Sequence, residues 1–302
     1  MHLLKRTQKY LCILLSIIFS CEVRAVDGFA TLQTIDLKKT SIAQFYAEQH
    51  HNEKVTESVS SAKLKSKVSD WKINVGGGFI VGEKPWRSLD VEAGALPYFQ
   101  AIYGNWQFGV NNMVSYHYKP GDTLSFSTGL NYRNDGYDSD FSPLNKLSDH
   151  PVFDGYQSPD GELVGNFGVK FGLFSLDVTQ DISDRSDSTS ASASFDIPLY
   201  ANKRGLMIKA IASAHWYNDK YVNYYYGINE QQTDISVGRF YYQTDAATNY
   251  QLGLSAVVPI NQKWAIVGQI SRTRLHENIT NSPLIDSEFQ DTLIAIVSYS
   301  LR

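Results

Sequence analysis

The chain has 302 residues, of which 43% are hydrophobic and 13% aromatic, and its formal net charge at pH 7 is -4. The small net charge and the lack of a lysine- or arginine-rich cluster argue against a nucleic-acid partner. Beyond the N-terminus no run of about 18 apolar residues occurs, which argues against a helical membrane protein. Because nothing in the composition separates two halves, one large domain is expected.

The first 25 residues have the layout of a Sec signal peptide. A basic start is followed by an apolar stretch over residues 10–19 and by Val23-Arg24-Ala25, which resembles a cleavage site. We expect cleavage after Ala25, which removes Cys12 and Cys21 and leaves no cysteine for a disulfide in the mature chain. A lipoprotein box ending at Cys21 is the less favoured alternative.

Residues 26–70 are polar and show no strand alternation. Within them, residues 41–50 can form one short helix on which Ile42, Phe45 and Tyr46 cluster. We expect this segment to be an extension outside the main domain, and a plug inside that domain is the alternative. No pattern in the sequence calls for a metal or another cofactor.

From Trp71 onward, apolar and polar residues alternate at every other position, as they do in strands with two unlike faces. Turn signals such as Pro120-Gly121-Asp122 separate one alternating stretch from the next. The predicted strands cover residues 71–81, 93–103, 106–110, 113–119, 123–133, 161–171, 174–182, 189–200, 205–217, 248–260, 263–273 and 291–301.

The stretch over residues 161–200 has two strongly unequal faces. Phe167, Leu176 and Phe195 lie on apolar faces, whereas the opposite faces carry small hydroxyls and carboxylates such as Ser192 and Asp177. Those polar faces have too little apolar bulk to form the inside of a two-sheet sandwich. The pattern predicts an all-β fold, a transmembrane antiparallel up-and-down β-barrel with apolar residues facing lipid and polar residues lining the lumen.

The connection lengths give independent support for this prediction. Short connections at residues 120–122, 172, 201–204 and 261–262 alternate with long ones at residues 134–160, 218–246 and 275–290. Outer-membrane barrels have short periplasmic turns and long external loops. We therefore expect about 12 strands, or alternatively 10, in a barrel over residues 71–302, with residues 26–70 in the periplasm. The chain ends on Arg302, whereas barrels of this kind commonly end on an aromatic residue.

Short motifs along the predicted barrel carry a family resemblance. They are Gly76-Gly77-Gly78, Leu96-Pro97-Tyr98, Tyr103-Gly104-Asn105-Trp106, Tyr132-Arg133-Asn134-Asp135-Gly136, Asn223-Tyr224-Tyr225-Tyr226-Gly227-Ile228, Gly238-Arg239-Phe240-Tyr241-Tyr242 and Ser282-Pro283-Leu284-Ile285. Together, and in this order, they resemble the MltA-interacting protein (MipA/OmpV) family of Gram-negative bacteria. The resemblance implies an outer-membrane barrel. For one branch it implies a scaffold that joins a lytic murein transglycosylase to a murein polymerase, and other branches look like adhesins or antibiotic-responsive proteins.

Polar side chains of both signs are predicted to line the lumen. They are Arg133, Glu162, Lys170, Asp177, Asp181, Asp196, Lys209, Ser213 and His215. The mixed signs favour a lumen partly closed by ion pairs and water, and a cation path is the alternative. Ser213 and His215 stand two apart, as in outer-membrane lipases. A lipase, however, needs this pair on the lipid side with a third orienting group, so we expect no catalytic residues.

The second long connection contains a candidate aromatic binding segment made of Tyr221, Tyr224, Tyr225 and Tyr226. The alternative is a loop that packs its own aromatic side chains over the barrel mouth. We expect a non-enzymatic scaffold in cell-wall maintenance, whose partners are outer-membrane lipid and the two murein enzymes. The alternative functions are a channel or transport protein for a small solute or an antibiotic, and an adhesin that acts through its outer loops.

Overall fold

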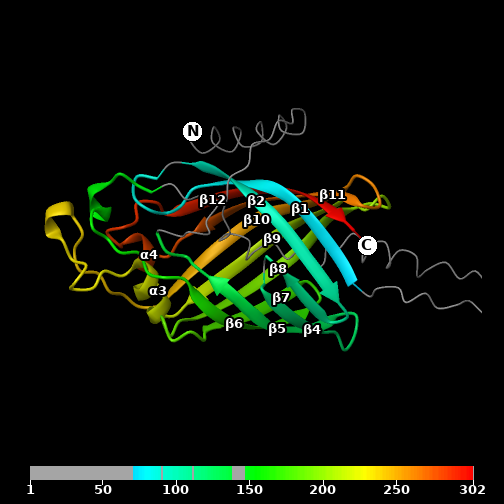
Figure 1. The fold of residues 1–302 in the computed structure, drawn as a ribbon, viewed down its shortest axis with the longest axis horizontal. Helices are drawn as coiled ribbons and strands as arrows, with labels where there is room; N and C mark the ends of the chain where they lie inside the picture. Colours follow the sequence, from blue (N-terminus) through cyan, green and yellow to red (C-terminus); the bar gives the residue numbers. More distant parts are fainter. Residues whose placement is uncertain (1–70, 90, 111, 138–146, 302) are drawn as a thin grey trace, which may run out of the picture.

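Twelve antiparallel strands close into a barrel in the computed structural model (Figure 1). The structure describes residues 71–89, 91–110, 112–137 and 147–301, and the strand count refers to these residues. Each strand pairs with its neighbours in the sequence, and β1 pairs with β12 to complete the ring. The predicted fold and strand number are therefore confirmed. The predicted signal peptide, the predicted extension over residues 26–70 and Arg302 lie outside the described residues.

The strand boundaries agree closely with the alternation in the sequence. The strands are β1 (Trp71–Gly82), β2 (Glu92–Tyr103), β3 (Trp106–Gly109), β4 (Val114–Tyr118), β5 (Leu124–Arg133), β6 (Glu162–Phe171), β7 (Phe174–Asp181), β8 (Thr189–Ala201), β9 (Met207–Tyr217), β10 (Ala247–Pro259), β11 (Trp264–Arg274) and β12 (Phe289–Ser300). Residues paired across two antiparallel strands share a face of the sheet. The register therefore assigns each side chain to the lumen or to the outside.

The outer face of the barrel is apolar. Phe167, Leu176 and Phe195 are 51%, 41% and 50% exposed, which is the opposite of what a dry protein core would show. On the other face, Asp177 of β7 pairs with Ser192 of β8, and both follow the inward row of hydroxyls and carboxylates. A surface with exposed aromatic and aliphatic side chains around the wall suits a lipid environment.

The inner wall departs from the predicted polar lumen near the seam where the barrel closes. A cluster of buried apolar side chains, here called the seam core, lies on the inward faces of β1, β2, β10, β11 and β12. Its members are Ile80, Leu96, Tyr98, Val257, Val267, Ile294 and Ile296. Glycines explain it, because a Cβ added at Gly76 or Gly78 would lie 2.2 or 1.9 Å from a carbonyl oxygen of β12. The glycines therefore let the backbone of β12 lie close to β1 beside this cluster.

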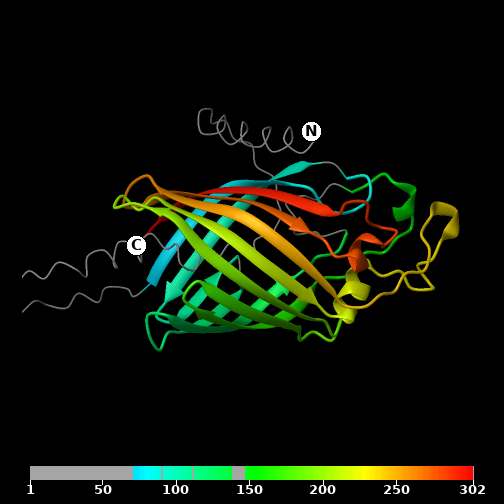
Figure 2. The ribbon, with the colours of Figure 1, turned by 180° about the vertical axis from the view of Figure 1, so that it is seen from behind.

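The two rims of the barrel differ as predicted. One rim, here called the turn rim, carries the short connections after β2, β4, β6, β8 and β10, while the other, the loop rim, carries the long ones (Figure 2). The loop rim also contains short helices that the sequence analysis did not predict: η4 (Pro151–Phe153), α3 (Asp219–Tyr226), η5 (Ile235–Val237) and α4 (Glu277–Thr280). None of the helices in the described ranges is long and apolar enough to cross a bilayer.

Candidate functional site

The loops of the loop rim pack into a second hydrophobic cluster, here called the lid core. Its buried members are Trp86, Tyr137, Val152, Phe153, Tyr221, Val222, Tyr225, Tyr226, Ile228, Ala247, Leu275, Ile279, Leu284 and Ile285. Apart from Ala247, the first residue of β10, they come from the connections after β1, β5, β9 and β11, so four separate loops share one core. Figure 1 shows α3 and α4 at this end of the barrel. The loops of the loop rim therefore pack against one another as one layer.

Aromatic side chains from different loops contact one another in the lid core. The rings of Tyr137 and Phe153 stack with their centroids 3.8 Å apart, and the ring of Trp86 lies 5.4 Å from that of Tyr226. Two arginines bind the loops through main-chain carbonyls: Arg87 donates to the oxygens of Pro283 and Ile285 at 3.0 and 3.1 Å. The second arginine, Arg239, donates to the main-chain oxygens of Val152 and Asp154.

The four tyrosines of the candidate binding segment lie on α3. This helix begins after Asn218, whose side chain accepts a hydrogen bond from the main-chain N–H of Tyr221 and so caps it. Tyr221, Tyr225 and Tyr226 are buried in the lid core, and burial raises the pKa values of all three phenols. The structure thus places these three side chains inside the loop layer, while Tyr224 is only half-buried and donates to the carbonyl of Asp160.

A buried polar network, here called the latch, joins α3 to the inner wall. Arg133 of β5 contacts Glu162 of β6, with its Nε 2.7 Å and its Nη2 2.6 Å from Oε1 of the carboxylate. Tyr225 donates its hydroxyl to the same oxygen at 3.0 Å. Ser186 and Ser188, from the connection between β7 and β8, also donate to this carboxylate. The buried charge of Glu162 is thus compensated by a cation and three hydroxyls.

Asp135 extends the latch toward the lid core. Tyr221 donates its hydroxyl to Oδ2 of Asp135 at 2.7 Å, and the guanidinium of Arg133 lies 4.9 Å from the centre of the Tyr221 ring. Desolvation raises the pKa of Asp135, although Arg133 and the Tyr221 hydroxyl partly oppose the shift. Two tyrosines of α3 therefore hold two carboxylates, one on the wall and one on the adjoining loop.

A second charged group lies inside the barrel nearer the turn rim. Lys170 Nζ is 3.1 Å and Lys209 Nζ 3.9 Å from Oδ2 of Asp196, and the three side chains are 12 to 16% exposed. Asp177 lies over Gly168, where an added Cβ would meet its Oδ1 at 2.3 Å. Asp181 instead accepts from four main-chain N–H groups of the connection that follows it, so its role is to shape that connection.

Ser213 and His215 lie on the inward face of β9, as their spacing predicts. The distance from Ser213 Oγ to His215 Nε2 is 3.0 Å. The same pair recurs on β4, where Ser115 Oγ lies 3.0 Å from His117 Nε2. The described residues place no carboxylate in hydrogen-bonding contact with His215, so the pair lacks the third member of a catalytic triad.

The loop between α3 and β10 projects beyond the lid core as an arm, defined here as residues 228–242 (Figure 2). Main-chain hydrogen bonds between Ile228 and Tyr242 close its base. Arg239 anchors it, donating to the carbonyls of Gln232, Val152 and Asp154 at 2.5, 2.6 and 2.9 Å. Ile235 at the tip is 80% exposed, and Phe240 and Tyr241 are about half exposed. Sequence reasoning did not single out Arg239 or Asp135, although both stand in motifs that carried the family resemblance.

A closed antiparallel barrel with an apolar outer face, a largely polar inner wall, short turns on one rim and long loops on the other is a transmembrane barrel of the outer-membrane class. A family model described as "MltA-interacting protein MipA" matches residues 75–301. The chain belongs to this family, and it is an outer-membrane protein.

Individual relatives agree with this assignment. Omp26La, an outer membrane protein of Vibrio anguillarum, is 33% identical over 88 residues, which is 29% of this chain and 34% of that protein. The MltA-interacting protein of Escherichia coli K12 is 27% identical over 95 residues, 32% of this chain and 38% of that protein. These matches thus span little more than a third of either relative. The putative outer membrane protein YiaT of the same strain is 22% identical over 240 residues, 76% and 90% of the two chains.

Among solved structures, the Ralstonia pickettii toluene transporter TbuX is similar at a TM-score of 0.35 and 9% identity, covering 78% of this chain and 90% of that one.

Proposed function

We propose that this protein is a non-enzymatic scaffold of the outer membrane that links a murein hydrolase of the lytic transglycosylase type to a murein polymerase. The proposal rests on membership of the MltA-interacting family and on the name of the Escherichia coli relative. Both enzymes act on the cell wall, so their binding surface has to face the periplasm. By the rule for outer-membrane barrels, that is the side of the turn rim.

The lid core is the structural observation that carries the proposal. Four loops close the loop rim with buried aromatic and aliphatic side chains, and the latch fastens this layer to the wall. Inside, near the turn rim, Lys170 and Lys209 both lie within 4 Å of the carboxylate of Asp196. A cylinder that is covered at its external end suits a passive anchor better than an open pore.

The scaffold proposal is tested by crosslinked pull-down from solubilised outer membranes. We expect a murein transglycosylase and a murein polymerase to be recovered with the full chain, and less of both when residues 26–70 are deleted. Substitution of Lys203 and Arg204 in the turn after β8 by glutamate should also reduce recovery if the turn rim is the binding surface. The matched control is Ile235→Ser on the arm, at the opposite rim. Recovery of no murein enzyme with any of these chains would remove the proposal.

Adhesion through the arm is the second candidate function. It is favoured by the exposed side chains of Ile235, Phe240 and Tyr241 on a segment whose base is held by Arg239. Binding of cells that carry the wild-type protein to a host surface, compared with cells that carry Ile235→Ser, separates this function from the scaffold. A channel is tested by conductance in planar bilayers, where discrete steps would support it and a scaffold would show none.

A further inference from the structure

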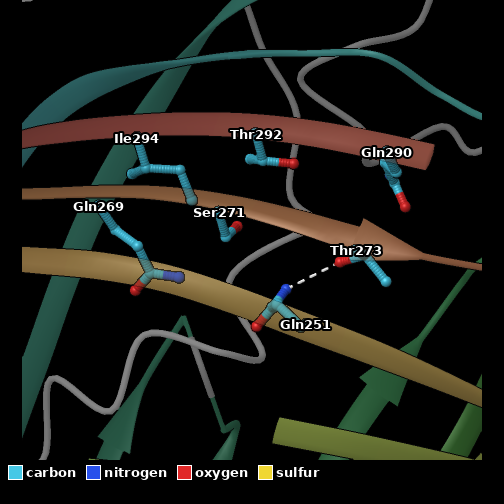
Figure 3. Close-up of a pocket in the computed structure, with 7 residues that line it drawn as sticks. All are labelled: Gln251, Gln269, Ser271, Thr273, Gln290, Thr292 and Ile294. Carbon is cyan, nitrogen blue, oxygen red and sulfur yellow. Dashed lines mark hydrogen bonds between the residues drawn. The ribbon is translucent and has the colours of Figure 1, made fainter. Parts of the chain in front are cut away.

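A small cavity lies on the inward faces of β10, β11 and β12 (Figure 3). Its volume is about 50 Å³. The residues that line it are Gln251, Gln269, Ser271, Thr273, Gln290, Thr292 and Ile294. The lining is therefore uncharged, with amides and hydroxyls on most sides and the hydrocarbon side chain of Ile294 on one.

Two carbonyl oxygens at this cavity lack a hydrogen-bond donor among the described residues. They are Oε1 of Gln251 and Oε1 of Gln269, on side chains of residues that are only 8% and 4% exposed. Gln251 donates its Nε2 to Thr273 Oγ1 at 3.0 Å, and in this arrangement its carbonyl oxygen has no donor among the described residues (Figure 3). A buried acceptor without a donor costs about 1–3 kcal/mol, so a bound molecule that supplies donors to both oxygens would be stabilised at this cavity.

The chemistry of the lining limits what that molecule can be. An ion would leave water for a site without a compensating charge, which is unfavourable. Water alone would satisfy the oxygens but would lose hydrogen bonds against Ile294. A short polyol has hydroxyls for Gln251 and Gln269 and a carbon skeleton for Ile294. One water molecule needs about 10–15 Å³ of cavity volume measured in this way. The cavity of about 50 Å³ therefore has room for roughly three to five waters, which is the space that a three-carbon polyol requires.

We propose that this cavity is a binding site for a small uncharged polyol of the glycerol class. The two glutamine oxygens accept from its hydroxyls, and Ser271 and Thr292 complete the polar surround. Ile294 packs against its carbon chain. The site is independent of the scaffold function, because it lies on the inward faces of β10–β12 and not on the turn rim.

The proposal is tested by titrating glycerol into the purified full-length protein in detergent micelles, with isotope-labelled isoleucine methyl groups observed by NMR. We expect a saturable change at Ile294 and only a linear solvent effect at Ile266, which faces outward on β11. Gln269→Leu should raise the half-saturation concentration at least threefold. The matched control is Gln107→Leu, a change of another buried glutamine, on β3, and it should leave the curve unchanged.

Two further arms separate the outcomes. Should Gln269→Leu fail to fold, Thr292→Val removes one hydroxyl with little change of shape and is expected to weaken binding in the same direction. Potassium chloride in place of glycerol should give no saturable change. A linear response to glycerol in the wild-type protein would mean that the cavity holds water only and would overturn the proposal, as would a saturable response to potassium without one to glycerol.

Discussion

Removing the hydroxyl of Tyr225 should loosen the lid core from the barrel wall without unfolding the barrel. The hydroxyl donates to Glu162 at 3.0 Å, and both residues are completely buried. A hydrogen bond to a charged group contributes about 1.5–3 kcal/mol to stability. Because Glu162 keeps Arg133 and two serine hydroxyls, we expect Tyr225→Phe to cost about 1.5 kcal/mol, the lower end of that range. At about 1.4 kcal/mol per factor of ten, the opening constant of α3 should rise roughly tenfold.

Hydrogen exchange followed by mass spectrometry measures this opening directly. In the regime where closing outpaces exchange, the rate for peptides from α3 follows its local opening constant. Exchange in Tyr225→Phe should be about tenfold faster over residues 219–226 and unchanged over β9, which is held by its neighbours on both sides. The matched control is Tyr241→Phe, which removes a half-exposed hydroxyl from the same loop and should have no effect on α3.

Unchanged exchange in α3 would refute the reasoning, since it would mean that the Tyr225 hydroxyl does not hold the helix. Equal acceleration of α3 and β9 would refute it differently. That result would show that the wall and the lid core open as one unit, so that the latch has no separate mechanical role.

The remaining predictions concern closure, the arm and pH. Gly78→Ala should abolish the compact, heat-modifiable band in unheated gels, because the new Cβ would lie 1.9 Å from the carbonyl oxygen of Ala295; Gly77→Ala, whose Cβ would have its nearest neighbour at 3.9 Å, should fold normally. Arg239→Met leaves three main-chain carbonyls without their donor, so chymotrypsin should cut the arm at least tenfold faster, and equal cleavage would contradict its role as an anchor. The raised pKa of Asp135 means that the closed lid binds a proton more tightly than the open one. Closing should therefore become more favourable as the pH falls through that raised value, and the gain should be complete below the ordinary value of 3.8. Exchange of α3, corrected for its intrinsic pH dependence, should slow on acidification, and Asp135→Asn should abolish this effect.

Strand alternation predicted the barrel wall well because the period of two is a local property. The last strand was expected over residues 291–301 and runs from Phe289 to Ser300. Alternation also assigned Arg133 and Glu162 to the inner wall. It could not pair them with each other, because their contact depends on the register between two strands separated by a long loop.

The seam core and α3 were missed for different physical reasons. Alternation tells which face a side chain is on but says nothing of curvature, so the effect of Gly76 and Gly78 on the wall could not be read from it. The helix α3 is short and rich in tyrosine, a residue with only moderate helix propensity. Its one clear local signal was Asn218 followed by Asp219, an N-cap with an acid in the first turn.

The order of the strands gives two neighbouring stretches of the inner wall a different chemistry. In an up-and-down barrel, strands that are consecutive in the sequence are neighbours in the wall. The charged residues that were predicted to line the lumen, from Arg133 to Lys209, therefore all lie on β5–β9. Their closest contacts are with one another or with the connections beside them. The adjoining stretch, β10–β12, has amides, hydroxyls and an aliphatic group along the cavity. An ion at this cavity would meet no charged side chain among the residues that line it. An uncharged solute would meet two acceptors, at Gln251 and Gln269, that have no donor among the residues the structure describes, so this stretch of wall suits a neutral ligand better than an ion.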